Sequence, residues 1–448
     1  MSFIKKTASF ILAVCLMCLL LAPAMAFSGV DIDILAEGAI LVDMETGDVL
    51  YEKNSHDKMY PASLTKIMTV LLAIELGDPA SEVVASKNAL TQGMSIYGSN
   101  QGILEGETMT LENYIYTAFI SSANEACNVI AEHIAGTIED FVVLMNERAA
   151  SIGCTGTHFA NPHGLHDENH YTCPADIALI AREAMQNETF ANLCSIKSIT
   201  IPATNMSEER TLHTTNYLIS NEMVGGYVYE YARGIKTGFT TPAGYCLTSS
   251  ASNGSMELLG VIMGADSFEE DGVNKIQSFV QMKRLFKWGF DTFSLQSIVS
   301  TTLPVAQVQV KYGATTNFVL AYPANQIYKL LPNGFNMDTV TSEVRVYNEG
   351  SIEAPVTKGD ILGEMDLFIE GKLMGTVPIL ALTNVERSGV EAAASGVKAV
   401  LSSKPVKIIG TAILIAFILF VLYILLCLWV RHKARTQGRY TGRGRRRR

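Results

Sequence analysis

The sequence predicts a mixed α/β fold of the α+β kind, in which one antiparallel sheet is flanked by helices and followed by a small β-rich domain. Apolar strand patterns lie near residues 39–51 and 234–263, and apolar helical patterns fill the chain between them. An Asn253-Gly254 pair separates two apolar runs, which is typical of an antiparallel hairpin. We expect the first strands to pair with the last ones, because the intervening helices can then cover one sheet.

The chain begins with the features of a secretory signal peptide in residues 1–26. Lys5 and Lys6 give a basic start, residues 10–21 are apolar, and Ala24-Met25-Ala26 fits a small-residue cleavage site. We therefore expect the mature chain to begin near Phe27; an uncleaved N-terminal anchor is the alternative.

The elements of the first domain, residues 27–292, follow from these patterns in order. A hairpin is expected first, because residues 39–44 and 49–51 are apolar runs on either side of a turn that contains Gly47. Helices are then expected over residues 111–134, with an interruption at Ser121-Ser122, and over residues 141–152, 176–185 and 276–290. Strands are expected over residues 234–239, 245–250 and 258–263.

The pattern of apolar residues changes after Phe293. Short strand patterns separated by turns predict a separate β-rich domain over residues 293–388. They lie at residues 298–310, 316–321, 342–347, 366–369 and 372–379. Residues 389–407 contain several Ala, Ser and Gly residues and are expected to form a linker.

Residues 408–430 predict a transmembrane helix near the C-terminus. This run has 23 residues without a charge, which at 1.5 Å per residue covers about 34 Å and is enough for a bilayer core. Nine positive charges and no acidic residue follow in residues 431–448. By the positive-inside rule this tail is cytoplasmic, and the preceding domains lie outside the cell membrane.

The charge distribution argues against a nucleic-acid partner. The chain has 34 Lys and Arg and 44 Asp and Glu. Two basic residues lie in the signal peptide and nine in the tail. The outer region, between the signal peptide and the predicted span, therefore has 23 basic and 44 acidic residues, a net charge of −21. Such a surface does not attract polyanions. The basic tail is expected to contact anionic lipid headgroups beside the span.

The cysteines do not indicate a disulfide framework. Five lie in the outer region: Cys127, Cys154, Cys173, Cys194 and Cys246. Because five is odd, at least one is free, and no CxxC or Cys/His spacing indicates zinc. A bridge between Cys154 and Cys173 stays open.

Ser63-Leu64-Thr65-Lys66 is the pattern that carries the most chemistry. A serine hydroxyl needs an adjacent base to act as a nucleophile, and on a helix a lysine three residues later lies on the same face. Pro61 and the apolar run after Lys66 favour a buried helix that begins here. The pattern alone is weak, because residues 2–5 also fit SxxK.

An ordered set of motifs strengthens the prediction. Ser122-Ala123-Asn124 fits SxN 59 residues after Ser63, and Lys236-Thr237-Gly238 fits KTG 114 residues after Ser122. SxN is common by chance and also fits residues 86–88, whereas KTG occurs once. The three motifs in this order are the signature of penicillin-interacting serine enzymes.

With these motifs the chain resembles the serine-type D-alanyl-D-alanine carboxypeptidases, the low-molecular-mass penicillin-binding proteins. The resemblance lies in residues 60–69, 122–126, 159–165 and 234–240, and it extends from about residue 34 to 388. It implies a penicillin-binding, serine β-lactamase-like first domain and includes the β-rich second domain. It implies no metal and no organic cofactor.

The resemblance also implies roles for particular residues. They are catalytic roles for Ser63, Lys66 and Ser122, and substrate-binding roles for Asn124, Lys236, Thr237, Gly238 and Phe239. Ser63 attacks the bond between the two terminal D-alanines of a peptidoglycan stem peptide, with Lys66 as general base and Ser122 as proton relay. Lys236 also helps to lower the pKa of Lys66.

The remaining implied roles concern the substrate. Asn124 holds its amide, Lys236 and Thr237 bind its terminal carboxylate, and Gly238 lets its backbone approach. The N–H groups of Ser63 and Phe239 form the oxyanion hole. β-Lactam antibiotics mimic this terminus and are expected to acylate Ser63.

Several nearby residues have no assigned role. His163, His166 and His170 lie beside Asp167 and Glu168 and invite a metal interpretation, but the resemblance implies a structural loop here. His213 is expected near the cleft without a chemical role, and Arg233 is undetermined.

Other functions stay open at this point. The same scaffold serves β-lactamases, which usually need a carboxylate to activate water, and D,D-endopeptidases that cut cross-links. A non-catalytic cell-wall sensor is the alternative from another class. The predicted span is also a departure, because relatives often end in an amphipathic helix on the membrane surface.

Overall fold

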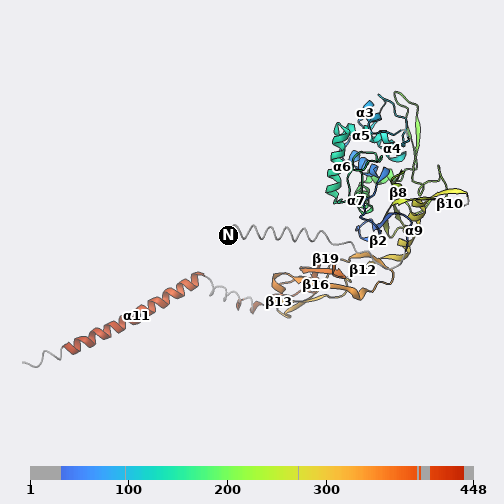
Figure 1. Ribbon diagram of the computed structural model, residues 1–448. Helices are drawn as coiled ribbons and strands as arrows, with labels where there is room; N and C mark the ends of the chain where they lie inside the picture. Colours follow the sequence, from blue (N-terminus) through green and yellow to red (C-terminus); the bar gives the residue numbers. More distant parts are fainter. Residues whose placement is uncertain (1–31, 96, 271, 391–392, 395–403, 438–448) are drawn as a thin grey trace, which may run out of the picture. The chain divides into compact units, whose positions relative to one another are not determined.

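The computed structural model describes residues 32–95, 97–270, 272–390, 393–394 and 404–437. The predicted signal peptide, most of the predicted linker and most of the basic tail lie outside the described residues. The chain divides into two compact units (Figure 1). Unit 1 contains residues up to 296 together with 328–335, and unit 2 contains residues 297–327 and those from 336 onward.

Unit 1 is built on a five-stranded antiparallel sheet with the order β2-β1-β9-β8-β7. Its strands are β1 (Gly38–Asp43), β2 (Val49–Lys53), β7 (Lys236–Thr240), β8 (Gly244–Ser252) and β9 (Glu257–Ala265). The first strand thus pairs with β9, about 220 residues later, as the strand positions in the sequence predicted. β7 is an edge strand, so one side of its backbone is unpaired within this sheet.

Both faces of the sheet are covered, and β1 shows why. Successive side chains of a strand point to opposite faces. Ile40 and Val42 enter one apolar core with the helices between the two groups of strands, whereas Ala39 and Leu41 enter a second core with α9. In Figure 1, helices α3–α7 accordingly gather on one side of the sheet and α9 on the other.

Most helices of unit 1 lie where the apolar periodicity placed them, whereas the short α3 and α8 were not predicted. The helices are the short 3₁₀ helix Ala62–Thr65, α2 (Lys66–Leu76), α3 (Lys87–Thr91), α4 (Leu111–Ile120), α5 (Asn124–Ala135), α6 (Ile138–Ile152), α7 (Pro174–Met185), α8 (Glu188–Cys194) and α9 (Gln277–Thr292). Side-chain caps stabilise the N-termini of several helices. The Thr110 hydroxyl accepts a hydrogen bond from Asn113 N–H at the start of α4, and the Thr137 hydroxyl accepts one from Asp140 N–H at the start of α6. The interruption expected at Ser121-Ser122 separates α4 from α5.

Three small hairpins of unit 1 were not predicted. They are β3 (Glu82–Val84) with β4 (Thr108–Thr110), β5 (Ser198–Ile201) with β6 (Arg210–His213), and β10 (Ser267–Glu270) with β11 (Val273–Ile276). Their strands have three or four residues, so each is too short to give an alternating pattern.

Unit 2 contains the predicted β-rich domain. Its six-stranded sheet has the order β16-β18-β19-β14-β13-β17. The strands are β13 (Ala306–Lys311), β14 (Phe318–Pro323), β16 (Val340–Val346), β17 (Ser351–Glu353), β18 (Ile361–Ile369) and β19 (Lys372–Ala381). A separate two-stranded sheet, which belongs to unit 1 except for Ser297, pairs β12 (Phe293–Ser297) with β15 (Tyr328–Pro332).

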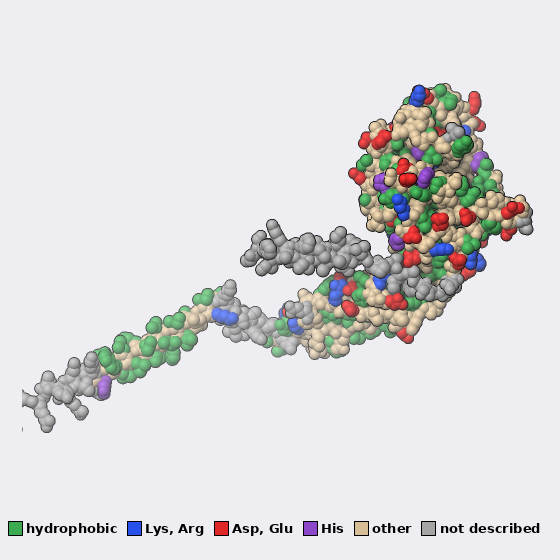
Figure 2. All heavy atoms as spheres, in the orientation of Figure 1, with side chains coloured by type: hydrophobic (Ala, Val, Ile, Leu, Met, Phe, Trp, Pro, Cys, Tyr) green, Lys and Arg blue, Asp and Glu red, His purple; other side chains and the backbone are tan. Residues whose placement is uncertain are grey.

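One long helix, α11 (Lys404–Gln437), contains the predicted span. Within residues 407–432 of this helix, an 18-residue window has a mean hydropathy of 3.2, and none of that window is buried within the protein. Figure 2 shows hydrophobic side chains along the described length of the helix. By length and composition it is long enough to cross a bilayer.

The cysteines correct one open interpretation. All described cysteines are free, so the bridge considered between Cys154 and Cys173 does not form. The Cys154 thiol instead lies 3.7 Å from the carbonyl oxygen of Asp176. Cys127, Cys194 and Cys246 are buried apolar side chains of the core.

Candidate active site

The three sequence motifs converge on one cleft of unit 1, with a cavity volume of about 700 Å³. Six of the eight predicted site residues line it: Ser63, Ser122, Asn124, Thr237, Gly238 and Phe239. The other two, Lys66 and Lys236, are buried directly behind this lining and reach it through their ammonium groups. The predicted site residues, of which Ser63 and Phe239 are 176 positions apart in the chain, thus share one site.

Ser63 lies in the 3₁₀ helix that leads directly into α2. The start of this helix is unusual because Ala62 has a φ of +47°, in the left-handed region that non-glycine residues rarely adopt. Thr65 helps to hold it, since its hydroxyl donates to the Ala62 carbonyl oxygen at 2.8 Å. This hydrogen bond therefore helps to hold the rare backbone conformation of Ala62 directly before Ser63.

Lys66 makes three hydrogen bonds with its Nζ atom. The acceptors are Ser63 Oγ at 2.9 Å, Asn124 Oδ1 at 2.7 Å and the carbonyl oxygen of His163 at 2.6 Å. An ammonium group has three donors, so all of them are used. When Lys66 loses one proton, two donors can remain on Asn124 and His163 while a lone pair faces the Ser63 hydroxyl.

Burial favours the loss of a proton from the Lys66 ammonium group. Its side chain is fully buried, and burial lowers the pKa of Lys66 to about 8, because the charged form is deprived of water. The neighbouring Cys127 and Glu125 act in the opposite direction and raise the pKa of Lys66. The net result is a lysine that is partly neutral near physiological pH.

The second motif lies in the turn between α4 and α5. Ser122 has a φ of +63°, which breaks the helical path and lets Asn124 begin the next helix. The Ser122 hydroxyl accepts a hydrogen bond from Lys236 Nζ at 3.1 Å. Its observed contact is thus with Lys236, although we expected it to exchange a proton with Lys66.

The third motif occupies the edge strand β7. Lys236 is buried, and desolvation followed by repulsion from Lys66 lowers its pKa well below the usual range of a lysine. Thr237 Oγ1 lies 2.6 Å from the hydroxyl oxygen of Thr215. A Cβ atom added to Gly238 would lie 3.0 Å from both Ser63 N and Pro61 O, so only glycine lets this strand approach the nucleophile so closely.

The histidine-rich loop has a structural explanation. His170 Nδ1 accepts from Ala160 N–H at 2.9 Å, and His170 Nε2 lies 2.7 Å from Thr65 Oγ1. Because the Thr65 hydroxyl already donates to Ala62, His170 donates in this contact and is neutral. Among the residues that the structure describes, no group of three or more His, Cys, Asp or Glu is arranged to hold a metal ion.

Several cleft residues were missed by the sequence analysis. Thr215, Tyr217, Tyr97 and Ser99 line the cleft but belong to no motif, so no local signal could have found them. The exposed Phe239 ring lies 4.4 Å from that of Tyr245 and extends one wall.

The two undetermined residues lie outside the cleft lining. His213 Nδ1 lies 2.9 Å from Glu222 Oε2. Arg233 is exposed, and its backbone N–H and carbonyl group bond to Ser250 of β8.

The fold and this constellation of serine, lysine and hydroxyl groups define a penicillin-binding type of serine hydrolase. The D-alanyl-D-alanine carboxypeptidase family matches residues 25–267, and the C-terminal domain of penicillin-binding protein 5 matches residues 293–387. The chain belongs to the D-alanyl-D-alanine carboxypeptidase family, and the resemblance predicted from its motifs is confirmed.

Individual relatives agree with this assignment. The D-alanyl-D-alanine carboxypeptidase DacF of Bacillus subtilis is 32% identical over 355 residues, which cover 79% of this chain and 87% of DacF. DacC of Escherichia coli is 29% identical over 368 residues, covering 79% of this chain and 85% of DacC.

Solved structures show the same fold. Penicillin-binding protein 5 of Haemophilus influenzae is 24% identical, with a TM-score of 0.60 over 80% of this chain and 100% of that one. The peptidoglycan synthesis regulatory factor PBP3 of Streptococcus pneumoniae is 23% identical, with a TM-score of 0.62 over 79% of this chain and 100% of that one.

Proposed function

We propose that this protein removes the terminal D-alanine from peptidoglycan stem peptides through an acyl-enzyme on Ser63, and so limits cross-linking. The observation that carries the proposal is the fully buried Lys66, whose Nζ lies 2.9 Å from Ser63 Oγ while two other acceptors fix its remaining donors. This is the arrangement of a nucleophile and its general base.

Acylation begins with neutral Lys66. It takes the proton of the Ser63 hydroxyl as the Ser63 oxygen attacks the carbonyl carbon between the two terminal D-alanines. The tetrahedral intermediate collapses, the carbon–nitrogen bond breaks, and the leaving D-alanine amine receives a proton. Ser122 relays that proton, with Lys236 bonded to its hydroxyl at 3.1 Å.

The substrate occupies the cleft beside β7. Lys236 and Thr237 bind its terminal carboxylate, because the negative charge of the bound substrate favours the protonated form of Lys236, and Asn124 holds its amide. The backbone N–H groups of Ser63 and Phe239 stabilise the oxyanion. The close packing of Gly238 on Ser63 supports this last role, because it brings β7 next to the nucleophile.

Water then releases the shortened peptide from Ser63. No Asp or Glu is among the described residues that line the cleft. A β-lactamase of this scaffold usually needs such a carboxylate to activate water quickly. We therefore expect a β-lactam to acylate Ser63 and to stay bound much longer than a peptide.

The test of this function is the release of free D-alanine from a pentapeptide that ends in D-Ala-D-Ala. We expect turnover by the wild-type chain and none by Ser63→Ala. Ser86→Ala is the matched control, since Ser86 heads the other SxN pattern but lies in the cap of α3, outside the cleft lining. Cleavage of a cross-linked dimer without release of D-alanine would instead identify an endopeptidase. A chain that is acylated by a β-lactam but shows neither activity would be a sensor.

We also propose that α11 anchors the protein in the cell membrane, with the two preceding units outside. The support is the apolar stretch 407–432 of the helix and the basic residues that follow it in the sequence. The cytoplasmic tail would contact anionic headgroups.

A further inference from the structure

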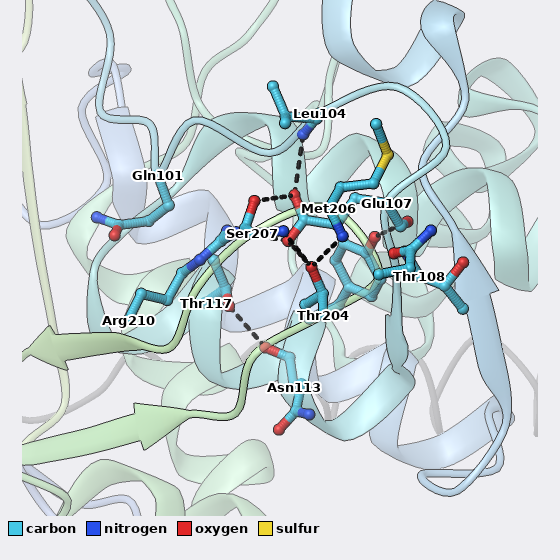
Figure 3. A network of polar contacts seen from close by, with 12 residues as sticks. Gln101, Leu104, Glu107, Thr108, Asn113, Thr117, Thr204, Met206, Ser207 and Arg210 are labelled. Carbon is cyan, nitrogen blue, oxygen red and sulfur yellow. Dashed lines mark hydrogen bonds and ion pairs between the residues drawn. The ribbon is translucent and has the colours of Figure 1, made fainter.

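A buried ion pair lies beside the cleft and takes no direct part in the proposed reaction. Glu107 is fully buried, and its carboxylate pairs with the guanidinium group of Arg210, which is 13% exposed. Figure 3 shows the Arg210 side chain and the hydroxyl groups of Thr204 and Ser207 converging on this carboxylate. The partners come from segments about 100 residues apart in the chain.

Glu107 ends a segment that forms part of the cleft wall. We call residues 97–107 the wall segment; its first three residues, Tyr97, Gly98 and Ser99, line the cleft. Glu107 Oε2 accepts a hydrogen bond from the backbone N–H of Leu104 at 3.0 Å. Glu107 therefore holds the end of the wall segment in two ways: its carboxylate accepts from Leu104 N–H, and its backbone carbonyl oxygen accepts from the Tyr114 hydroxyl at 3.0 Å.

The same segment contacts Asn124. The Ser99 carbonyl oxygen accepts from Asn124 N–H at 2.9 Å, and Gln101 N–H donates to Glu125 Oε1 at 2.6 Å. The contact is close, since a Cβ atom on Gly98 would lie 2.6 Å from Asn124 Nδ2. A shift of the wall segment must therefore move Asn124, which in turn is bonded to Lys66 Nζ.

Arg210 connects the wall segment to the opposite wall. It begins β6, and Thr215, five residues later, lies 2.6 Å from the Thr237 hydroxyl in the KTG motif. Asn205, in the turn before β6, bonds to Thr108 N–H and to the carbonyl oxygen of Gly106. One short segment, from Asn205 to Thr215, thus contacts both walls of the cleft.

We propose that the Glu107–Arg210 pair has a positioning role in the reaction. It fixes the wall segment, so that Asn124 keeps its position relative to Lys66 and the substrate amide. The inference rests on the proposed function, because acylation of Ser63 is its main readout. Neither residue touches the reacting atoms; the pair acts through Asn124.

The first test compares one double variant in two backgrounds of the full-length protein. Glu107→Gln with Arg210→Met removes both charges and leaves no unpaired buried one. We expect it to lower the second-order rate of acylation by benzylpenicillin about tenfold or more in the wild-type background, because small misplacements of this kind are costly. In an Asn124→Ala background the further loss should be less than about twofold, since the two changes act through one contact.

Two variants separate positioning from general stability. Arg210→Lys keeps the charge but loses the planar fork, so it should recover part of the acylation rate. Arg148 lies on α6, away from the cleft lining, and pairs with Glu75 of α2 and Glu183 of α7. Arg148→Met removes these ion pairs and should leave the rate unchanged. Should the double variant fail to fold, Thr204→Val, which removes one neutral donor to Glu107 at 3.0 Å, is compared in the same two backgrounds.

Hydrogen exchange gives a readout that does not depend on activity. The amides of Gln101 and Leu104 should exchange faster in the double variant, whereas those of α6 should not. Equal fold losses in both backgrounds, or unchanged exchange at Gln101, would overturn the positioning role. A wild-type chain that is not acylated at all would contradict the proposed function, and the exchange result would still decide this inference.

Discussion

Lys66 determines how the activity should depend on pH. Only the neutral amine can accept the Ser63 proton, and burial lowers the pKa of Lys66 to about 8. Below that pH the neutral fraction falls tenfold per pH unit. We therefore predict that the acylation rate rises about tenfold per unit up to pH 7 and levels off above about 8. Stopped-flow acylation with a chromogenic cephalosporin measures this profile, and a rate that is flat or falling from pH 6 to 8 would exclude Lys66 as the base.

Gly238 predicts a large effect from one methyl group. In Gly238→Ala the new Cβ would lie 3.0 Å from Ser63 N and Pro61 O, which are backbone atoms, so β7 must move away from the nucleophile. We expect acylation to fall about 10²-fold, the scale seen when one oxyanion-hole donor is lost. Gly225→Ala is the matched control, because an added Cβ there meets nothing within 4 Å. Equal rates for the two variants would contradict the close approach.

At the residue scale the sequence predicted what short motifs can encode. Ser63 and Lys66 are three positions apart, so helical geometry alone brought them together. The other partners of Lys66, Asn124 and the His163 carbonyl, come from 58 and 97 positions away. No periodicity specifies such contacts, and the same holds for Glu107 and Arg210.

At the scale of elements, the long apolar segments were predictable and the short polar ones were not. β8 and β9 have nine residues each around a turn that contains Asn253-Gly254, which is a strong hairpin signal. β5 and β6 have four residues each and include exposed polar side chains. Their pairing depends on tertiary contacts, although β6 and the two residues after it connect the two walls of the cleft.

The histidine-rich loop predicts a stability effect at low pH. Burial lowers the pKa of His170 to about 3 from 6.5, so within this window the unfolded chain binds more protons than the folded one. The free energy of unfolding should therefore fall as pH decreases from 6.5 towards 3, by up to about 1.4 kcal/mol per pH unit from this residue.

Urea unfolding between pH 4 and 7 measures that slope. His170→Asn should lower stability at pH 7, because it loses the bonds to Ala160 and Thr65, yet it should show a shallower pH dependence. His56→Asn, at an exposed position, should leave the slope unchanged. An equal slope in wild type and His170→Asn would contradict the buried neutral histidine.

At the scale of the whole molecule, function is divided among separate parts. The cleft and its motifs lie entirely in unit 1, whereas α11 has the composition of a membrane span. We predict that removal of residues 404–448 moves the protein from the membrane fraction to the soluble one and changes the rate of D-alanine release by less than about twofold. Fractionation of cells followed by the peptide assay tests this. Continued membrane association of the truncated chain would show that α11 is not the only anchor.

The measurement that bears most directly on the account is mass spectrometry of the full-length protein after exposure to benzylpenicillin, with free D-alanine assayed from a pentapeptide in parallel. We predict one stoichiometric adduct on the peptide that contains Ser63, together with D-alanine release, and neither in Ser63→Ala. An adduct on another residue, or undiminished labelling of Ser63→Ala, would contradict Ser63 as the nucleophile and with it the proposed mechanism.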